Sequence, residues 1–189
     1  MREGLYWQVA IPDNKLRKSQ IRAEMKNRLR CHANDSSGVV SRVLQWLAER
    51  PEVKMVAAYH SLFGEPNLAE LFNSRTDLLW VFPRVSAENL TFHHSSKNPG
   101  ALIVGSFGTR EPAVDSPMAI LTEIDAFLCP GLAFDLNRNR LGRGRGFYDR
   151  TLSRANPQAQ KVGICFPFQR VEDVFPESHD VAMDCVIDG

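Results

Sequence analysis

The chain has 189 residues, of which 43% are hydrophobic, enough for one sizeable domain with a buried core. Its formal net charge is only +1, which excludes the strong overall positive field of proteins that bind nucleic acids or membranes non-specifically. The four cysteines are far apart and form no Cys-x-x-Cys pair, so we expect neither a disulfide framework nor a zinc site. With no apolar run long enough for a membrane span and no signal sequence, we expect a cytoplasmic protein.

The basic residues are concentrated in two segments of this nearly neutral chain. Residues 15–30 contain seven basic residues and one acidic residue, and residues 138–150 contain five arginines and one acidic residue. Two local clusters of this kind favour a small anionic ligand over an extended polyanion. We expect a single domain over residues 1–189, with a loosely ordered lead-in over residues 1–14.

The first predicted helix begins near residue 15, where Asp13 or Asn14 can cap it. Its apolar and basic residues each recur at spacing four, which places them on two neighbouring faces. The apolar stripe consists of Ile21, Met25 and Leu29, and the basic stripe of Lys18, Arg22 and Lys26. A basic stripe is most often a solvated face, and spacing alone does not assign it to a ligand.

Short apolar runs then alternate with helical segments. We expect strands at residues 53–59, 78–82, 90–93, 126–129, 161–166 and 184–187, and helices at residues 39–50, 68–72 and 147–155. This alternation predicts an α/β fold of three layers, with a mostly parallel central sheet flanked by helices. Ligands bind at the carboxyl ends of such strands. We therefore expect Glu65, Arg84 (after a strand ended by Pro83), Phe107 and the loop after residue 130 to share one pocket.

That loop alternates glycines with arginines over residues 142–146. The glycines allow positive φ and a close approach of the backbone to a ligand, and we expect this of Gly142, Gly144 and Gly146. The arginines provide planar donors for phosphate oxygens, and a helix that starts after Gly146 would add its first amides. Gly/Arg tracts also occur in mobile surface loops and RNA contacts, but bulky apolar residues on both sides indicate a folded setting for this one.

The same region resembles the signature of a known family. Pro-Gly-Leu-Ala-Phe-Asp at residues 130–135 and Asn-Arg-Leu-Gly-Arg-Gly-Arg-Gly-Phe-Tyr-Asp at residues 139–149 are similar to the signature of the 5-formyltetrahydrofolate cyclo-ligases, also called methenyltetrahydrofolate synthetases. Shorter family patterns follow in the right order at residues 18–22, 61–65, 83–84, 107–112 and 179–184. The resemblance runs from residue 18 to the end of the chain and implies a fold like that of the NagB/RpiA/CoA-transferase-like proteins.

The resemblance implies closure of 5-formyltetrahydrofolate to 5,10-methenyltetrahydrofolate with ATP and Mg²⁺, releasing ADP and phosphate. Transfer of the γ-phosphoryl group to the formyl oxygen activates the formyl carbon, which nitrogen 10 then attacks. Such a transfer relies on positioning and on neutralising charge. A site of arginines, glycine amides and carboxylates, without a protein nucleophile, suits that chemistry.

Site residues follow from the resemblance. The expected ATP-binding residues are Lys18, Ser19, Gln20, Ile21, Arg22, Arg140, Leu141, Gly142, Arg143, Gly144, Arg145, Gly146, Phe147 and Tyr148. Among them, Arg143, Arg145 and Tyr148 are expected to be catalytic. The expected folate-binding residues are His60, Glu65 and Phe107, and the expected magnesium ligands are Asp149 and Asp184. His60, Arg145 and Phe147 depart from the residues that the family more often has at these positions.

Two other classes of protein remain open. One is a different nucleotide-dependent phosphotransferase, although the chain has no G-x-x-x-x-G-K-[ST] loop. The other is an RNA-binding module that uses Arg143 and Arg145, against which the net charge argues. We expect a small-molecule substrate, no nucleic-acid or membrane partner, and a monomer.

Overall fold

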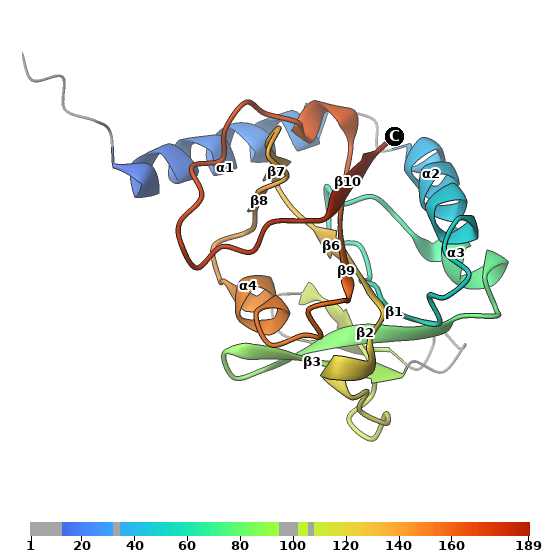
Figure 1. The fold of residues 1–189 in the computed structure, drawn as a ribbon. Helices are drawn as coiled ribbons and strands as arrows, with labels where there is room; N and C mark the ends of the chain where they lie inside the picture. The colour runs from blue at the N-terminus through green and yellow to red at the C-terminus, as the bar shows by residue number, and fades with distance from the viewer. Residues whose placement is uncertain (1–12, 32–34, 95–101, 106–107) are drawn as a thin grey trace, which may run out of the picture.

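The computed structural model describes residues 13–31, 35–94, 102–105 and 108–189, so Phe107 and most of the predicted lead-in lie outside the described residues. Its centre is a six-stranded sheet in the order β10-β9-β6-β1-β2-β3 (Figure 1). The strands are β1 (Met55–Ala57), β2 (Leu79–Ser86), β3 (Asn89–His94), β6 (Ala126–Pro130), β9 (Gln160–Cys165) and β10 (Cys185–Asp188). Only the pair of β2 and the edge strand β3 is antiparallel. The predicted, mostly parallel sheet is confirmed.

Four α-helices accompany the sheet in the described residues: α1 (Asn14–Cys31), α2 (Ser37–Ala48), α3 (Ala69–Ser74) and α4 (Phe147–Leu152). Two of them begin where a side chain accepts a hydrogen bond from a backbone N–H of the first turn, and Asp13 is the cap that the sequence predicts for α1. Asp13 accepts a hydrogen bond from the backbone N–H of Lys15 at 3.0 Å, and Asn67 accepts one from Ala69 at 3.0 Å. Short 3₁₀ turns lie at Leu121–Glu123 and Pro167–Gln169.

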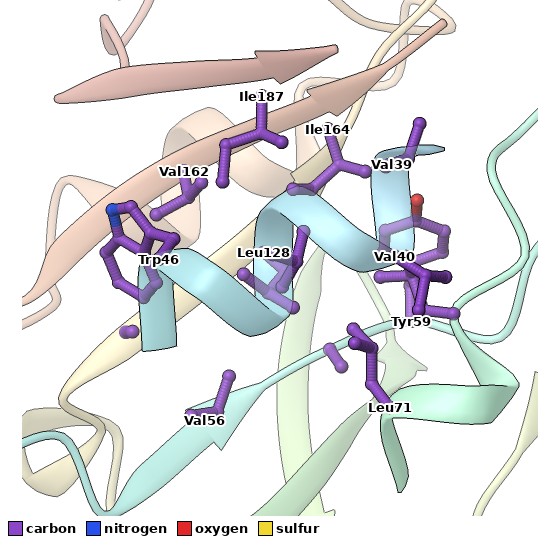
Figure 2. Packing of buried hydrophobic residues seen from close by; sticks show 14 of the residues in the cluster. Val39, Val40, Trp46, Val56, Tyr59, Leu71, Leu128, Val162, Ile164 and Ile187 are labelled. Carbon is purple, nitrogen blue, oxygen red and sulfur yellow. The ribbon is translucent and has the colours of Figure 1, made fainter. Parts of the chain in front are cut away.

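Two hydrophobic clusters fill the space on the two faces of the sheet, because successive strand residues point to opposite faces. Val56 and Leu128 belong to the cluster under α1, α2 and α3, whereas the neighbouring Ala57 and Phe127 belong to the cluster that includes residues of α4. Figure 2 shows Trp46 of α2 packed over the face of the sheet that α1, α2 and α3 cover. Helices on both faces give the predicted three layers.

Two small hairpins supplement the sheet. β7 (Ala133–Phe134) pairs with β8 (Arg140–Leu141), and this hairpin lies beside α1 (Figure 1). β4 (Ile103–Val104) pairs with β5 (Arg110–Glu111), which contacts β2. In the part of the chain that the structure describes, no helix is both long and apolar enough to cross a membrane.

The predicted end of the second strand at Pro83 is wrong. β2 continues through Pro83, which pairs with Phe92 of β3, and it ends only at Ser86. Pairing with β1 stops at Val81, so among the described residues this part of β2 is paired with a strand on one side only, where the missing N–H of a proline is tolerated.

Arg84 therefore lies inside a strand, and its side chain does not join the pocket that we expected: Pro83 and Val85 line the cavity at the ends of β1 and β6, whereas Arg84, between them, does not. Its guanidinium donates to the carbonyl oxygens of Pro112, Ala113 and Val114. Arg84 thus holds the segment after β5 against the hairpin of β2 and β3.

Candidate active site

A cavity of about 1120 Å³ lies where β1 and β6 end. Tyr59 and His60 follow β1, Pro130 ends β6 and Gly131 follows it; all four line the cavity. The other walls come from α1, the loop at residues 62–65, β5, the Gly/Arg loop and residues 177–180. The carboxyl edge of the parallel sheet is where open α/β folds bind ligands.

The α1 helix presents two of its five predicted ATP-binding residues to the cavity. Lys18 and Arg22 line it, since spacing four places both on one face. Ser19 and Gln20 are exposed, and Ile21 packs against the hydrophobic cluster. None of these three is among the described residues that line the cavity.

Lys18 is only 6% exposed and is held by two carboxylates. Its ammonium donates to Glu177 at 2.8 Å and to Asp180 at 2.7 Å. Burial lowers the pKa of Lys18, but the hydrogen bonds to Asp180 and Glu177 outweigh it and raise the pKa above its usual value. Lys18 is therefore a charged group at neutral pH. Our site prediction missed Glu177 and Asp180, although the His-Asp pattern at residues 179–180 pointed to this segment.

The backbone of the Gly/Arg loop has positive φ at two of the three predicted glycines, 97° at Gly144 and 64° at Gly146. Gly142 does not share that conformation; a Cβ there would lie 2.9 Å from an Nη1 atom of Arg140, so close packing explains this glycine instead. Arg22 donates to the carbonyl of Gly142 at 3.0 Å and ties the loop to α1. α4 begins directly after Gly146, as predicted.

Arg143 is paired within the cavity. Its Nε donates to Oε1 of Glu65 at 3.1 Å, and its Nη2 donates to the carbonyl of Phe63 at 3.1 Å. The other oxygen of Glu65 accepts the backbone N–H of Leu62 at 2.9 Å. The structure thus places the predicted phosphate arginine and the predicted folate carboxylate in direct contact.

Arg140 binds several parts of the site to one another, and its side chain is only 4% exposed. Its Nη2 donates to both carboxylate oxygens of Asp149 at 3.1 Å, and its Nη1 donates to the carbonyl of Pro130 at 3.3 Å. The guanidinium also lies 5.2 Å from the centre of the Tyr148 ring. These contacts hold the end of β6 and the start of α4 together.

The remaining predicted loop residues, Leu141, Arg145, Phe147 and Tyr148, also line the cavity. Arg150, which the sequence prediction left out, donates to the carbonyls of Arg145 and Glu88. Burial raises the pKa of Tyr148 well above its usual value. Its hydroxyl therefore stays protonated at neutral pH and can donate a hydrogen bond.

His60 lines the cavity with its ring stacked on Phe82, at 4.3 Å between ring centres. Its Nε2 is buried and has no hydrogen-bond partner among the described residues. Burial, and then the positive charge of Arg110, lower the pKa of His60 to about 4. The imidazole is neutral at physiological pH.

Asp184 is not brought to the cavity. It precedes β10, which runs parallel to β9, so it lies at the amino end of the strand, opposite to the cavity edge. Its carboxylate accepts the backbone N–H of Lys161 at 2.7 Å. Asp180 does line the cavity, and the next backbone N–H, of Val181, donates to Asp149 at 3.4 Å. Within the described ranges, no group of three or more His, Cys, Asp or Glu side chains is arranged to hold a metal ion.

Acidification should destabilise the protein partly through His60. Its pKa of about 4 in the fold is below the usual 6.5, so the unfolded chain takes up the proton first as the pH falls. The stability that comes from keeping His60 neutral is fully present above pH 6.5 and is lost as the pH falls from 6.5 to about 4. The loss in the free energy of unfolding is roughly 1–2 kcal/mol after allowance for the partial exposure of the ring. Urea unfolding at pH 7.5 and 5 should show a larger loss in the wild type than in His60→Leu. His179→Gln, at an exposed histidine, is the control; equal losses in the wild type and His60→Leu would rule His60 out.

Comparison with known proteins identifies the family of this chain. Residues 14–189 match the model of the 5-formyltetrahydrofolate cyclo-ligase family. A 5-formyltetrahydrofolate cyclo-ligase of Mycolicibacterium smegmatis is 33% identical over 90% of this chain and 92% of its own length. One from Haemophilus influenzae is 30% identical over 93% of this chain and its whole length, 100%.

A solved structure has the same fold. The 5,10-methenyltetrahydrofolate synthetase of Aquifex aeolicus superposes with a TM-score of 0.78 at 30% identity, covering 90% of this chain and 89% of that one. The synthetase of Mycoplasma pneumoniae, at 21% identity and a TM-score of 0.68, shares the fold. The family expected from the sequence signature is confirmed: this chain belongs to the 5-formyltetrahydrofolate cyclo-ligase family.

Proposed function

We propose that the protein closes 5-formyltetrahydrofolate to 5,10-methenyltetrahydrofolate with ATP, releasing ADP and phosphate. One observation carries this proposal beyond family membership. A single cavity of about 1120 Å³ contains a Gly/Arg loop suited to phosphates and a buried carboxylate, Glu65, suited to a pterin. The volume is slightly above the usual range for one drug-sized ligand, about 300–1,000 Å³, and it suits two ligands that must react with each other.

The proposed nucleotide side consists of the Gly/Arg loop and α1. Positive φ at Gly144 and Gly146 shapes a loop whose backbone a phosphate can approach closely. Arg22 fixes that loop through the carbonyl of Gly142, and Lys18 contributes a buried charge. Arg143 and Arg145 would then neutralise the charge that develops on the transferred phosphoryl group.

The proposed folate side is formed by Glu65 and His60. A carboxylate with two accepting oxygens matches the adjacent N–H groups of a pterin ring, and Glu65 is only 7% exposed. His60, being neutral, offers a hydrogen bond without adding charge next to the substrate.

In the proposed reaction, the formyl oxygen attacks the γ-phosphorus and ADP leaves. Nitrogen 10 then attacks the formyl carbon, loses its proton, and phosphate departs with the former formyl oxygen. Tyr148, with its raised pKa, would donate a hydrogen bond to one of these oxygens. The cavity walls would exclude competing water. No protein nucleophile is required.

We propose that Asp149 and Asp180 hold the Mg²⁺ ion together with the phosphates of ATP. Mg²⁺ in such sites is bound by one or two carboxylates and substrate oxygens, which fits two neighbouring aspartates better than a complete protein cage. The ion would neutralise charge on the phosphates. This pair replaces the pair of Asp149 and Asp184 expected from the sequence.

The choice between these aspartates can be tested directly. Asp180→Asn should raise the Mg²⁺ concentration needed for half-maximal turnover by about ten- to a hundred-fold, the scale seen when metal-site residues are altered. Asp184→Asn should leave that concentration unchanged, because its carboxylate is bound to the N–H and the ammonium of Lys161, away from the cavity. Magnesium titrations of both variants, with circular dichroism to confirm folding, decide the matter. The opposite ranking would restore Asp184 and remove Asp180.

The function itself is tested by mixing the protein with 5-formyltetrahydrofolate, ATP and Mg²⁺ and following the near-ultraviolet absorbance of the methenyl product. Released ADP, measured in parallel, should equal the product formed. Folded protein that forms no product would contradict the proposal. ADP release without methenyl product would favour another nucleotide-dependent phosphotransferase. A monomeric, cytoplasmic state remains a prediction from the sequence.

A further inference from the structure

Arg143 and Glu65 connect the two sides of the cavity. They are 78 residues apart in the chain, yet the Nε and Nη2 atoms of Arg143 both lie 3.1 Å from Oε1 of Glu65. Arg143 belongs to the Gly/Arg loop, whereas Glu65 follows β1. We assign Arg143 to the phosphates of the nucleotide and Glu65 to the folate, yet in this structure the two side chains bind each other.

The contact uses the groups that the ligands need. Oε1 of Glu65 is taken by Arg143 and Oε2 by the backbone N–H of Leu62. Arg143 also donates to the carbonyl of Phe63, so its guanidinium is directed onto the loop at residues 62–65. While this pair is intact, a phosphate has to compete with Glu65 for the Nε and Nη2 donors of Arg143, and a pterin can reach Oε1 of Glu65 only by sharing it with Arg143.

The burial of the two partners is unequal. The Glu65 side chain is 7% exposed and the Arg143 side chain 40% exposed. A buried carboxylate left without its cation loses more than an exposed guanidinium does. Removing Arg143 from Glu65 is therefore unfavourable unless something else occupies the carboxylate.

We propose that the Arg143–Glu65 ion pair couples the binding of nucleotide and folate, so that each ligand tightens the binding of the other. This inference rests on the proposed function. Nucleotide alone must break the pair to engage Arg143, and folate alone must break it to engage Glu65. When both bind, the pair is broken once for two ligands, and the second ligand binds with no such penalty. Folate bound at Glu65 also frees Arg143 to bind the phosphates, so the arginine contacts the nucleotide when the folate substrate is present.

The coupling is reciprocal, because linkage requires each ligand to change the affinity of the other by the same factor. Its size is bounded by the strength of the pair. A partly exposed ion pair has a strength that corresponds to a factor of about two to five in affinity.

Calorimetry can measure this factor without turnover. AMP-PNP, a nucleotide that does not transfer its terminal phosphoryl group, is titrated with Mg²⁺ into the protein with and without saturating 5-formyltetrahydrofolate, and the reverse titration checks reciprocity. In the wild type we expect folate to tighten AMP-PNP binding about two- to five-fold.

Variants of the pair give the sharper test. Glu65→Gln removes the charge of the carboxylate while keeping an oxygen for the N–H of Leu62. It should tighten AMP-PNP binding about two- to five-fold in the absence of folate, and remove the coupling. Arg143→Ala should weaken AMP-PNP binding and also remove the coupling.

The double variant separates the ion pair from a general loss of negative charge. In the Arg143→Ala background, Glu65→Gln should no longer tighten AMP-PNP binding, because the pair is already gone. A general electrostatic effect would persist in both backgrounds and would overturn the inference. So would a wild-type protein that binds both ligands with no effect of one on the other. Failure of the folded wild type to bind either ligand would instead overturn the proposed function, and the coupling with it.

Discussion

Replacing Arg140 with alanine should lower the free energy of unfolding by about 3–5 kcal/mol, the scale for breaking a buried ion pair by removing one partner. The Arg140 and Asp149 side chains are 4% and 13% exposed. The substitution would leave the Asp149 carboxylate buried without its cation. It would also remove the donor to the carbonyl of Pro130 at the end of β6. Urea unfolding followed by tryptophan fluorescence measures the loss.

Two comparisons make this prediction specific to the buried pair. Arg75→Ala breaks an even shorter pair with Asp77, at 2.8 Å against 3.1 Å for Arg140 and Asp149, but the Asp77 carboxylate is 60% exposed; this variant should lose no more than about 1 kcal/mol. The double variant Arg140→Ala/Asp149→Ala should be more stable than Arg140→Ala alone, because the stranded carboxylate is gone. If Arg140→Ala kept full stability but lost nucleotide affinity, Arg140 would be a phosphate ligand and not an organiser of the site.

The sequence predicted the layout of the fold because that layout depends on local patterns. The alternation of apolar runs with helical segments predicted the parallel sheet, and Asp13 marked where the first helix begins. Spacing four put Lys18 and Arg22 on one face of α1. The family signature predicted the Gly/Arg loop as a unit, since that loop is continuous in the chain.

Contacts between distant segments could not be predicted in this way. Pro83 suggests the end of a strand, but the tolerance for it inside β2 depends on where β1 stops pairing. Neither spacing nor composition shows that Arg143 lies on Glu65. The choice between Asp180 and Asp184 depends on the direction in which β10 runs, and that direction is known only from the sheet.

Phe134 connects the Gly/Arg loop to the central sheet. Its side chain is 0% exposed, and it lies in β7, paired with Arg140 of β8. Its ring fills the space above two glycines: a Cβ would lie 2.7 Å from it at Gly131 and 2.5 Å at Gly163. Phe134 therefore joins the hairpin that leads into the Gly/Arg loop to both β9 and the end of β6.

Phe134→Ala should lower the free energy of unfolding by about 3–5 kcal/mol, since the ring leaves a cavity that two glycines cannot fill. It should also weaken AMP-PNP binding in the folded protein, because β8 loses the support that positions the Gly/Arg loop. Phe127→Ala is the matched control: Phe127 is also 0% exposed and in the same cluster, but it lies in β6 away from the cavity lining. The stability of the Phe127→Ala variant should fall by a similar amount, while its nucleotide affinity stays near that of the wild type. Phe134→Leu, a milder change, keeps the comparison possible if the alanine variant does not fold. If both alanine variants fold and bind AMP-PNP equally well, Phe134 contributes to stability without positioning the loop.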